Sequence, residues 1–255
     1  MLEITSVSNT KIKDVVKLHQ KKYRNEKGLF IIEGYKPIFE GFNSKIEIEN
    51  IYTTQKHVEK FNFAKDKVII VTDAVLEKIS TTDSMPEAVA VAKQNKQSIE
   101  QIKNKKRILL LENVKDAGNL GTLIRSACAF SIDGILLCGD TVDIYNPKVI
   151  RSTVGAMFKL PIIKTTIEDA KKAFNSSKFI ATVVNHKNIV TPEAINYKDA
   201  FVIMCGSEAD GLTQEAISVA DIKTTIPISS KTESLNLSTA GSILLYISST
   251  CLIWA

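Results

Sequence analysis

The segment ILLLENVKDAGNLGTLIRSACAF, residues 108–130, is the part of the chain that decides the fold. It opens with four apolar residues, continues as a polar loop with two glycines, and from residue 120 has the apolar spacing of a helix. A strand without alternating polar positions is typical of a sheet that helices cover on both faces. The segment therefore predicts one strand–loop–helix unit of a parallel α/β sheet.

The same order of elements recurs toward the C-terminus. Strands are predicted at 108–112, 134–138, 178–184, 201–205 and 222–228. Helices are predicted at 120–130, 147–158, 167–175 and 238–252. Ligands of such sheets bind beyond the carboxyl ends of the strands, so the loops that follow strands are the candidate functional segments.

The chain before residue 108 has a different pattern. Residues 94–107, QNKQSIEQIKNKKR, are polar and basic, and we interpret them as a linker between a first domain, residues 1–93, and a second, residues 108–255. Residues 9–18 have the apolar spacing of an amphipathic basic helix. Three β-branched runs follow, at 28–34, 67–73 and 87–93. The first domain is predicted to be a small α/β unit.

The composition is that of an ordinary globular protein. The chain has 255 residues, of which 44% are hydrophobic and 24% charged, which excludes a fibrous or disordered protein. The four cysteines form no CxxC pair and the three histidines lie far apart, so no metal site is expected. We find no signal peptide and no apolar run of the ~20 residues that a membrane span needs, and we expect a cytoplasmic protein.

The loop after the first strand of the second domain contains two candidate residues. Its glycines form GNLG rather than GxGxxG or a P-loop, so a Rossmann nucleotide site is not supported. Asn119 is placed to cap the helix that follows. Arg125 lies in the second turn of that helix, where it either faces solvent or binds an anion.

Two later loops also combine polar residues with glycine. In GSEADGL, residues 206–212, Glu208 either reaches a ligand at the sheet edge or complements the dipole of the next helix. In IPISSKTESLNLSTAG, residues 226–241, Ser234 and Asn236 are suited to cap the last helix. Capping alone does not explain why all three loops follow parallel strands.

Together, the motifs N-L-G-x-x-x-R, G-S-E-x-x-G-L and I-P-I followed by S-L-N-L-S resemble those of the SpoU family of RNA ribose methyltransferases, in the SPOUT superfamily. The resemblance covers about residues 108–250 and includes N-P-K-V-I-R-S-T-V-G-A at 146–156. SxxNxxIK at 6–13 and F-I-I-E-G at 30–34 are similar to the substrate-binding domain often joined to this catalytic domain.

The resemblance implies a fold and a reaction. The fold is a parallel sheet flanked by helices with a C-terminal trefoil knot, preceded by a small α/β domain like a ribosomal protein. The reaction is methyl transfer from S-adenosylmethionine to a ribose 2′-hydroxyl of RNA, without a metal. Ribosomal RNA is the expected substrate, and transfer RNA or a non-catalytic RNA-binding homologue is the alternative. A nucleotide-dependent transferase or dehydrogenase is the rival class, which the missing nucleotide motifs disfavour.

The resemblance also implies site residues. The catalytic set is Arg125, Asn119, Glu208, Ser234 and Asn236, and the cofactor-binding set is Gly206, Ile226 and Leu235. The family assigns the arginine as the base, but a guanidinium with a pKa above ~12 stays charged in proteins. We hypothesise that Arg125 binds the phosphate beside the target and favours the alkoxide, while that phosphate or Glu208 takes the proton.

The charge of the chain is unevenly distributed. Residues 1–107 carry 20 basic and 14 acidic side chains, whereas residues 108–255 carry 13 and 14. Since lysine and arginine contact RNA phosphates without reading sequence, the first domain is expected to hold RNA. The expected RNA contacts are Lys11, Lys13, Lys21, Lys22 and Arg24. The family also implies a homodimer, and the last helix is apolar on more than one face.

Overall fold

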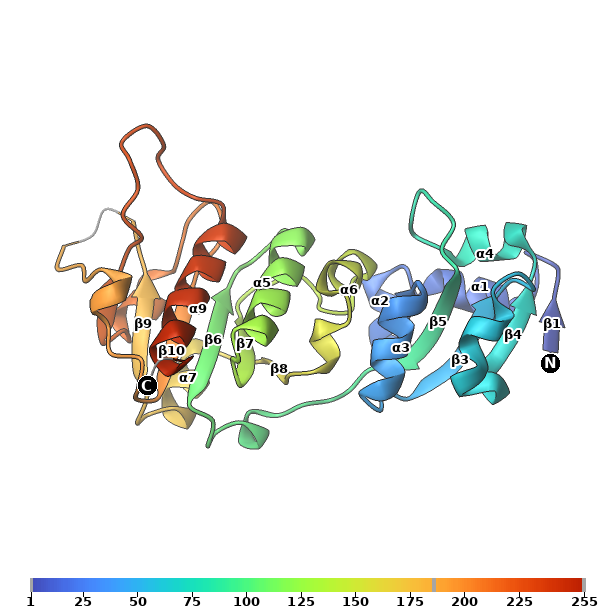
Figure 1. Cartoon of the computed structure of the whole chain (residues 1–255), viewed down its shortest axis with the longest axis horizontal. Coiled ribbons are helices and arrows are strands. Elements are labelled where there is room, and N and C mark those ends of the chain that lie inside the picture. Colours follow the sequence, from blue (N-terminus) through green and yellow to red (C-terminus); the bar gives the residue numbers. More distant parts are fainter. Residues whose placement is uncertain (1, 185–186, 254–255) are drawn as a thin grey trace. The chain divides into compact units, whose positions relative to one another are not determined.

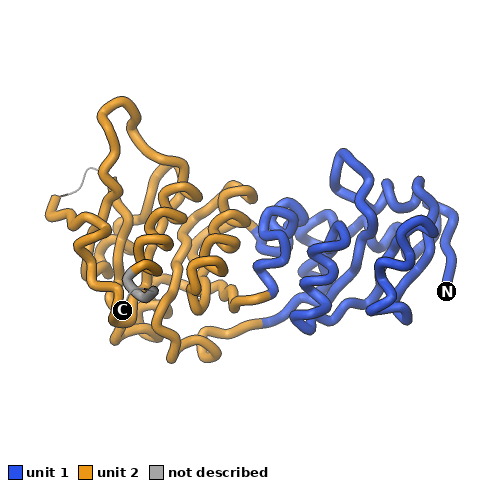
Figure 2. Tube along the Cα trace, in the orientation of Figure 1, with its two compact units in different colours: residues 1–96, 143–158 blue, residues 97–142, 159–255 orange. Residues whose placement is uncertain are grey.

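The computed structural model describes residues 2–184 and 187–253, with the backbone alone for 251–253. The chain forms two compact units (Figure 2). Unit 1 consists of residues 1–96 and 143–158, and unit 2 of residues 97–142 and 159–255. No helix in the described ranges is long and apolar enough to cross a membrane.

Unit 2 is built on a six-stranded sheet with the order β11-β9-β10-β6-β7-β8. Every strand pairs in parallel with its neighbours. The strands are β6 (Arg107–Glu112), β7 (Gly134–Cys138), β8 (Ile162–Lys164), β9 (Lys178–Thr182), β10 (Phe201–Cys205) and β11 (Ile222–Thr224). Adjacent β6 and β10 are buried along almost their whole length, as expected when helices cover both faces.

Helices cover the two faces of this sheet. Unit 2 contains α5 (Ala117–Ala129), α7 (Ile167–Ala173), α8 (Gln214–Ser218), α9 (Leu237–Ile253), and the 3-10 turns η2 (Ile99–Gln101) and η4 (Pro192–Ala194). Residues of α7 and α8 share one buried cluster with Ile108 and Leu110 of β6. On the other face, α5 and α9 lie side by side (Figure 1). A Cβ added at Gly241 would lie 2.4 Å from Leu123 Cδ2, so this glycine permits the close packing of α9 on α5.

Unit 1 contains a five-stranded mixed sheet with the order β1-β4-β3-β5-β2. Its strands are β1 (Leu2–Ile4), β2 (Leu29–Glu33), β3 (Ile48–Thr53), β4 (Val68–Val71) and β5 (Ala88–Lys93). Its helices are α1 (Thr10–Lys17), α2 (Lys21–Lys27), α3 (Tyr35–Asn43), η1 (Val58–Lys67), α4 (Asp73–Ile79), α6 (Pro147–Thr153) and η3 (Ala156–Phe158). Ile12, Val15 and Leu18 pack from the first helical segment onto one face of the sheet.

Residues 143–158 were predicted to belong to the second domain, residues 108–255. In the structure they pack in unit 1 instead. The Phe30 ring lies 4.7 Å from the Tyr145 ring, and the Arg151 guanidinium bonds to the Glu33 carboxylate at 2.5 Å. Residues 94–107, the predicted linker, are also divided differently in the structure. The units divide between residues 96 and 97, and Ile102 is buried in the unit 2 core.

Most predicted elements of the second domain have the expected type, and several of them end earlier than predicted. Strands end at Thr182 and Thr224 rather than at 184 and 228. The helix predicted to reach residue 158 ends at Thr153, because Val154 and Gly155 adopt positive φ of 50° and 87°. The three-residue strand β8 was not predicted. The trefoil knot stays a prediction, since strand order and pairing do not define how the chain threads.

Candidate functional site

Three predicted residues from three distant segments of the sequence meet beyond the carboxyl ends of β6 and β10. Asn119 Nδ2 donates a hydrogen bond to Glu208 Oε1 at 2.7 Å. Asn236 Nδ2 donates to Asn119 Oδ1 at 3.0 Å. These side chains, here called the amide–carboxylate chain, connect the start of α5, the loop after β10 and the start of α9.

Asn119 does not cap α5, contrary to the sequence-based expectation. The helix begins earlier than predicted, at Ala117, and Asp116 is its cap, accepting a hydrogen bond from the Asn119 backbone N–H at 2.8 Å. Because the cap is already supplied, the Asn119 side chain is available to join Glu208 and Asn236.

Asn236 uses its amide oxygen for one role and its amide nitrogen for another. Its Oδ1 accepts hydrogen bonds from Ser238 N at 2.8 Å and Ser238 Oγ at 2.7 Å, which caps α9 as predicted. Its Nδ2 donates to Asn119. Capping and a place in the site are therefore compatible.

The loop that carries Glu208 is a closed turn. The backbones of Ser207 and Gly211 exchange two hydrogen bonds, at 3.0 and 3.1 Å. A Cβ at Gly206 would lie 2.0 Å from the carbonyl carbon of Gly211, and Gly211 itself has φ of 67°. Glycine is needed at both ends of this turn, which holds the Glu208 carboxylate exposed at the sheet edge.

Sequence reasoning missed Glu112, the last residue of β6. Its side chain is buried, and its two carboxylate oxygens accept hydrogen bonds from Thr213 N and Thr213 Oγ1, both at 2.8 Å. Thr213 in turn caps α8. Glu112 thus fixes the far end of the Glu208 turn to β6. The detectable signal is a carboxylate that ends an otherwise apolar strand, since a buried charge needs hydrogen-bond partners.

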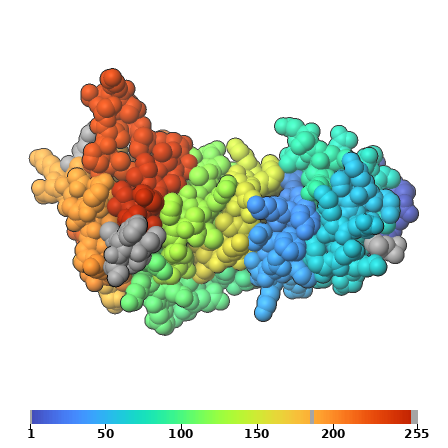
Figure 3. All heavy atoms as spheres, viewed as in Figure 1, coloured from blue at the N-terminus to red at the C-terminus, as the bar shows by residue number. Residues whose placement is uncertain are grey.

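The other predicted site residues form no hydrogen bond with the amide–carboxylate chain. Arg125 is exposed and makes no hydrogen bond or ion pair with any described residue. Ser234 is exposed, and its carbonyl accepts a hydrogen bond from Thr232 Oγ1 at 3.1 Å. Half-buried Ile226 and Leu235 lie at the two ends of the segment between β11 and α9. This segment projects from unit 2 (Figures 1 and 3).

The exposed Glu208 carboxylate at this edge can complement a positive charge on a ligand. Among the described residues there is no cluster of metal-ligating side chains. The nearby thiols of Cys138 and Cys205 are buried, and burial raises the pKa of each to about 12, so neither is a nucleophile.

In unit 1 the structure separates the predicted RNA-binding residues into two groups. Lys11, Lys13, Lys21 and Lys22 are exposed, as a phosphate contact requires. Arg24 is the exception, and its prediction as an RNA contact is wrong. Its side chain is 2% exposed, and its guanidinium donates to Asp143 Oδ2 at 2.6 and 3.0 Å and to the Leu18 and His19 carbonyls.

An all-parallel sheet with three polar loops joined at one edge is the arrangement of an α/β ligand-binding enzyme. Residues 106–246 match the model of the SpoU rRNA methylase family, and residues 9–107 match the MRM3-like substrate binding domain. The chain belongs to the SpoU rRNA methylase family.

The similarity to known proteins extends over nearly the whole chain. One is the 23S rRNA (guanosine(2553)-2′-O)-methyltransferase RlmP of Bacillus subtilis, 28% identical over 96% of this chain and 98% of that protein. An AdoMet-bound rRNA methyltransferase of Sinorhizobium meliloti superposes with a TM-score of 0.88, at 29% identity over 96% of both chains. A solved RNA 2′-O ribose methyltransferase has a TM-score of 0.84, at 27% identity over 99% of this chain and 100% of that one.

The burial of Arg24 predicts a loss of stability when it is removed. Arg24→Ala should lower the free energy of unfolding by about 3–5 kcal/mol, because it leaves the Asp143 carboxylate without its partner. Lys21→Ala, on an exposed position of the same helix, should change it by less than about 0.5 kcal/mol. Urea denaturation of both variants measures the difference. Equal stability of the two, with weaker RNA binding by Arg24→Ala, would restore Arg24 as an RNA contact.

Proposed function

We propose that this protein transfers a methyl group from S-adenosylmethionine to a ribose 2′-oxygen of 23S ribosomal RNA. The observation that supports this most directly is the amide–carboxylate chain, which joins the three family motifs at one edge of the sheet. The full-length similarity to an enzyme named for 23S rRNA 2′-O-methylation supports the substrate. The exposed lysines of unit 1 supply the positive charge that an RNA partner needs.

Gly206, Ile226 and Leu235 would hold the cofactor. Ile226 and Leu235 contribute apolar surface for the adenine, and Gly206 keeps the Glu208 turn closed beside it. When bound, S-adenosylmethionine supplies a methyl group on a positively charged sulfur. The carboxylate of Glu208 complements that charge.

The residues of the chain must bind the target ribose and accept its proton. A guanidinium has five donors and no acceptor, so Arg125 binds the neighbouring phosphate and stabilises negative charge on the 2′-oxygen rather than acting as a base. As the 2′-oxygen takes the methyl group, the methyl–sulfur bond would break to leave a neutral thioether, and the hydroxyl proton would pass to Glu208 or to that phosphate. Asn119 fixes one oxygen of Glu208 by donating to it, and Ser234 contributes a hydroxyl near the target.

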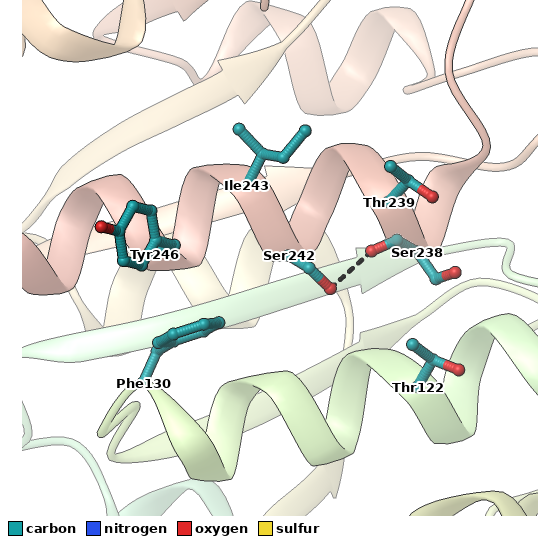
Figure 4. Close-up of a pocket in the computed structure, with 7 residues that line it drawn as sticks. All are labelled: Thr122, Phe130, Ser238, Thr239, Ser242, Ile243 and Tyr246. Atoms are coloured by element: carbon teal, nitrogen blue, oxygen red, sulfur yellow. Dashed lines mark hydrogen bonds between the residues drawn. The ribbon is translucent and has the colours of Figure 1, made fainter.

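We also infer that the protein works in the cytoplasm as a homodimer. A surface groove of about 420 Å³ lies between α5 and α9 (Figure 4). It is lined by Thr122, Phe130, Ser238, Thr239, Ser242, Ile243 and Tyr246. The Tyr246 ring is 56% exposed and contacts the Phe130 ring at 5.8 Å. Ser238 is also bonded to Asn236, so a second copy seated in the groove would border the amide–carboxylate chain.

Methylation mapping tests the proposed function. Deleting the gene should remove a 2′-O-methyl group from 23S ribosomal RNA, and expressing the wild-type protein should restore it. Arg125→Ala should not restore it, because the positive charge beside the 2′-oxygen is lost, whereas Lys172→Ala, at an exposed position of α7, should. Total RNA, transfer RNA included, is mapped by the resistance of 2′-O-methylated positions to alkaline cleavage. A ribosomal RNA that is unchanged by the deletion contradicts the proposal.

Light scattering tests the homodimer. The wild-type protein should have twice the 28.2 kDa mass of one chain. Tyr246→Glu should shift the mass toward that of the monomer, because it places a charge in the groove. Val184→Glu is the matched control, since Val184 is also exposed, at 60%, but lies outside the groove. A monomeric wild-type protein, or equal dissociation by the two variants, contradicts an α5–α9 interface.

A further inference from the structure

Unit 1 contains a pocket that the amide–carboxylate chain does not explain. It has a volume of about 260 Å³ and lies between the α1–α2 segment and one face of the sheet. Val15, Leu18, Leu29 and Val91 provide its apolar surface. Since ligand pockets usually measure about 300–1,000 Å³, this one suits a group about the size of a nucleobase.

A buried tyrosine contributes a polar group to this pocket. Tyr52 of β3 lines it and is 2% exposed, yet none of the described residues hydrogen-bonds its hydroxyl. Burial raises the pKa of Tyr52 to about 12, and the Glu49 and Asp14 carboxylates add to this shift. The hydroxyl therefore stays protonated at neutral pH and is available as a donor.

An irregularity in β3 brings two more polar side chains to the same pocket. The pairing of β3 with β5 shifts register between Ile48 and Asn50. Neighbouring residues of a regular strand point to opposite faces, but Glu49 and Asn50 both line the pocket. The bulge redirects a side chain, as bulges beside functional sites do. The pocket wall therefore combines two hydrogen-bond acceptors, Glu49 and Asp14, with an amide.

The rim of the pocket is basic. Lys11, Lys17 and Lys27 line it with exposed side chains, and they outnumber the two carboxylates. Lys17 is bonded to Asp14 at 2.8 Å. A ligand that fits would have a flat apolar face, amino groups for the carboxylates, and negative charge for the lysines.

We propose that this pocket binds the base of one unpaired RNA nucleotide. The base lies on the apolar residues, its exocyclic amino group donates to Glu49, since Asp14 already accepts from Lys17, and the adjoining phosphates contact the lysine rim. Because the wall is rich in acceptors, cytosine, adenine and guanine bind more tightly than uracil, which has no exocyclic amine. This proposal depends on the proposed function in one respect, which is that RNA is the partner of the protein.

Equilibrium binding of two short oligonucleotides to the full chain tests this site. Tetracytidylate and tetrauridylate carry equal charge. A difference between their affinities, measured by fluorescence anisotropy of the labelled oligonucleotides, therefore reports the contribution of the base. The wild-type protein should bind tetracytidylate about five- to tenfold more tightly, as expected for about one hydrogen bond. Glu49→Gln should abolish this preference, and Tyr52→Phe should weaken the binding of both oligonucleotides.

Two variants outside the pocket serve as controls. Glu47→Gln removes the same charge from an exposed residue two positions earlier, and Tyr35→Phe removes a hydroxyl from α3. Both should keep the wild-type affinities. No preference in the wild-type protein, or an equal loss in Glu47→Gln and Glu49→Gln, overturns the site. Because Glu49 is exposed, its variant keeps the test valid if Tyr52→Phe fails to fold.

The two proposals fail in distinguishable ways. If the protein methylates 23S ribosomal RNA but binds the two oligonucleotides equally, the base-binding pocket is contradicted and the proposed function stands. If the protein prefers tetracytidylate but transfers no methyl group, the pocket stands and the proposed function is contradicted.

Discussion

The two hydrogen bonds of the amide–carboxylate chain are the interaction on which the site depends. They join residues that are 89 and 117 positions apart in the sequence. Such a contact forms only because β6 and β10 are parallel neighbours, so that the loops after both strands open at the same edge. Packing of α9 on α5 then brings the third loop to Asn119.

Buried contacts near the amide–carboxylate chain keep the segments that carry its three residues in place. Glu112 ties Thr213 to β6, Gly206 allows the Glu208 turn to close, and Gly241 allows α9 to approach Leu123. None of these three residues needs to touch a substrate. Each helps to hold a residue of the amide–carboxylate chain in place, which is how a preorganised site is built.

The sequence was informative where the pattern is local. Continuous apolar runs predicted the strands of unit 2, because a sheet covered on both faces requires them, and the polar loops after those strands contained Asn119, Glu208 and Asn236. Contacts between distant segments were not predictable. Arg24 is charged like its lysine neighbours, and only the fold shows that Asp143, 119 positions away, buries it. The same applies to residues 143–158, whose packing in unit 1 has no signal in their own sequence.

Short elements and side-chain pairings were also beyond prediction. A three-residue strand such as β8 is too short to show periodicity, and Asp116 rather than Asn119 caps α5 because the helix begins one turn earlier than its apolar spacing indicates. Only the geometry shows that the cap leaves the Asn119 side chain available to Glu208.

A double-mutant cycle on Asn119 and Glu208 tests the amide–carboxylate chain most directly. The rate of methyl transfer to 23S ribosomal RNA is measured for Asn119→Ala, Glu208→Gln and the double variant, with thermal melting as a check on folding. If the two residues act as one unit, the double variant is no slower than the slower single variant. Losses that multiply, with all three proteins folded, would show that Asn119 and Glu208 act independently and would contradict this role of the chain.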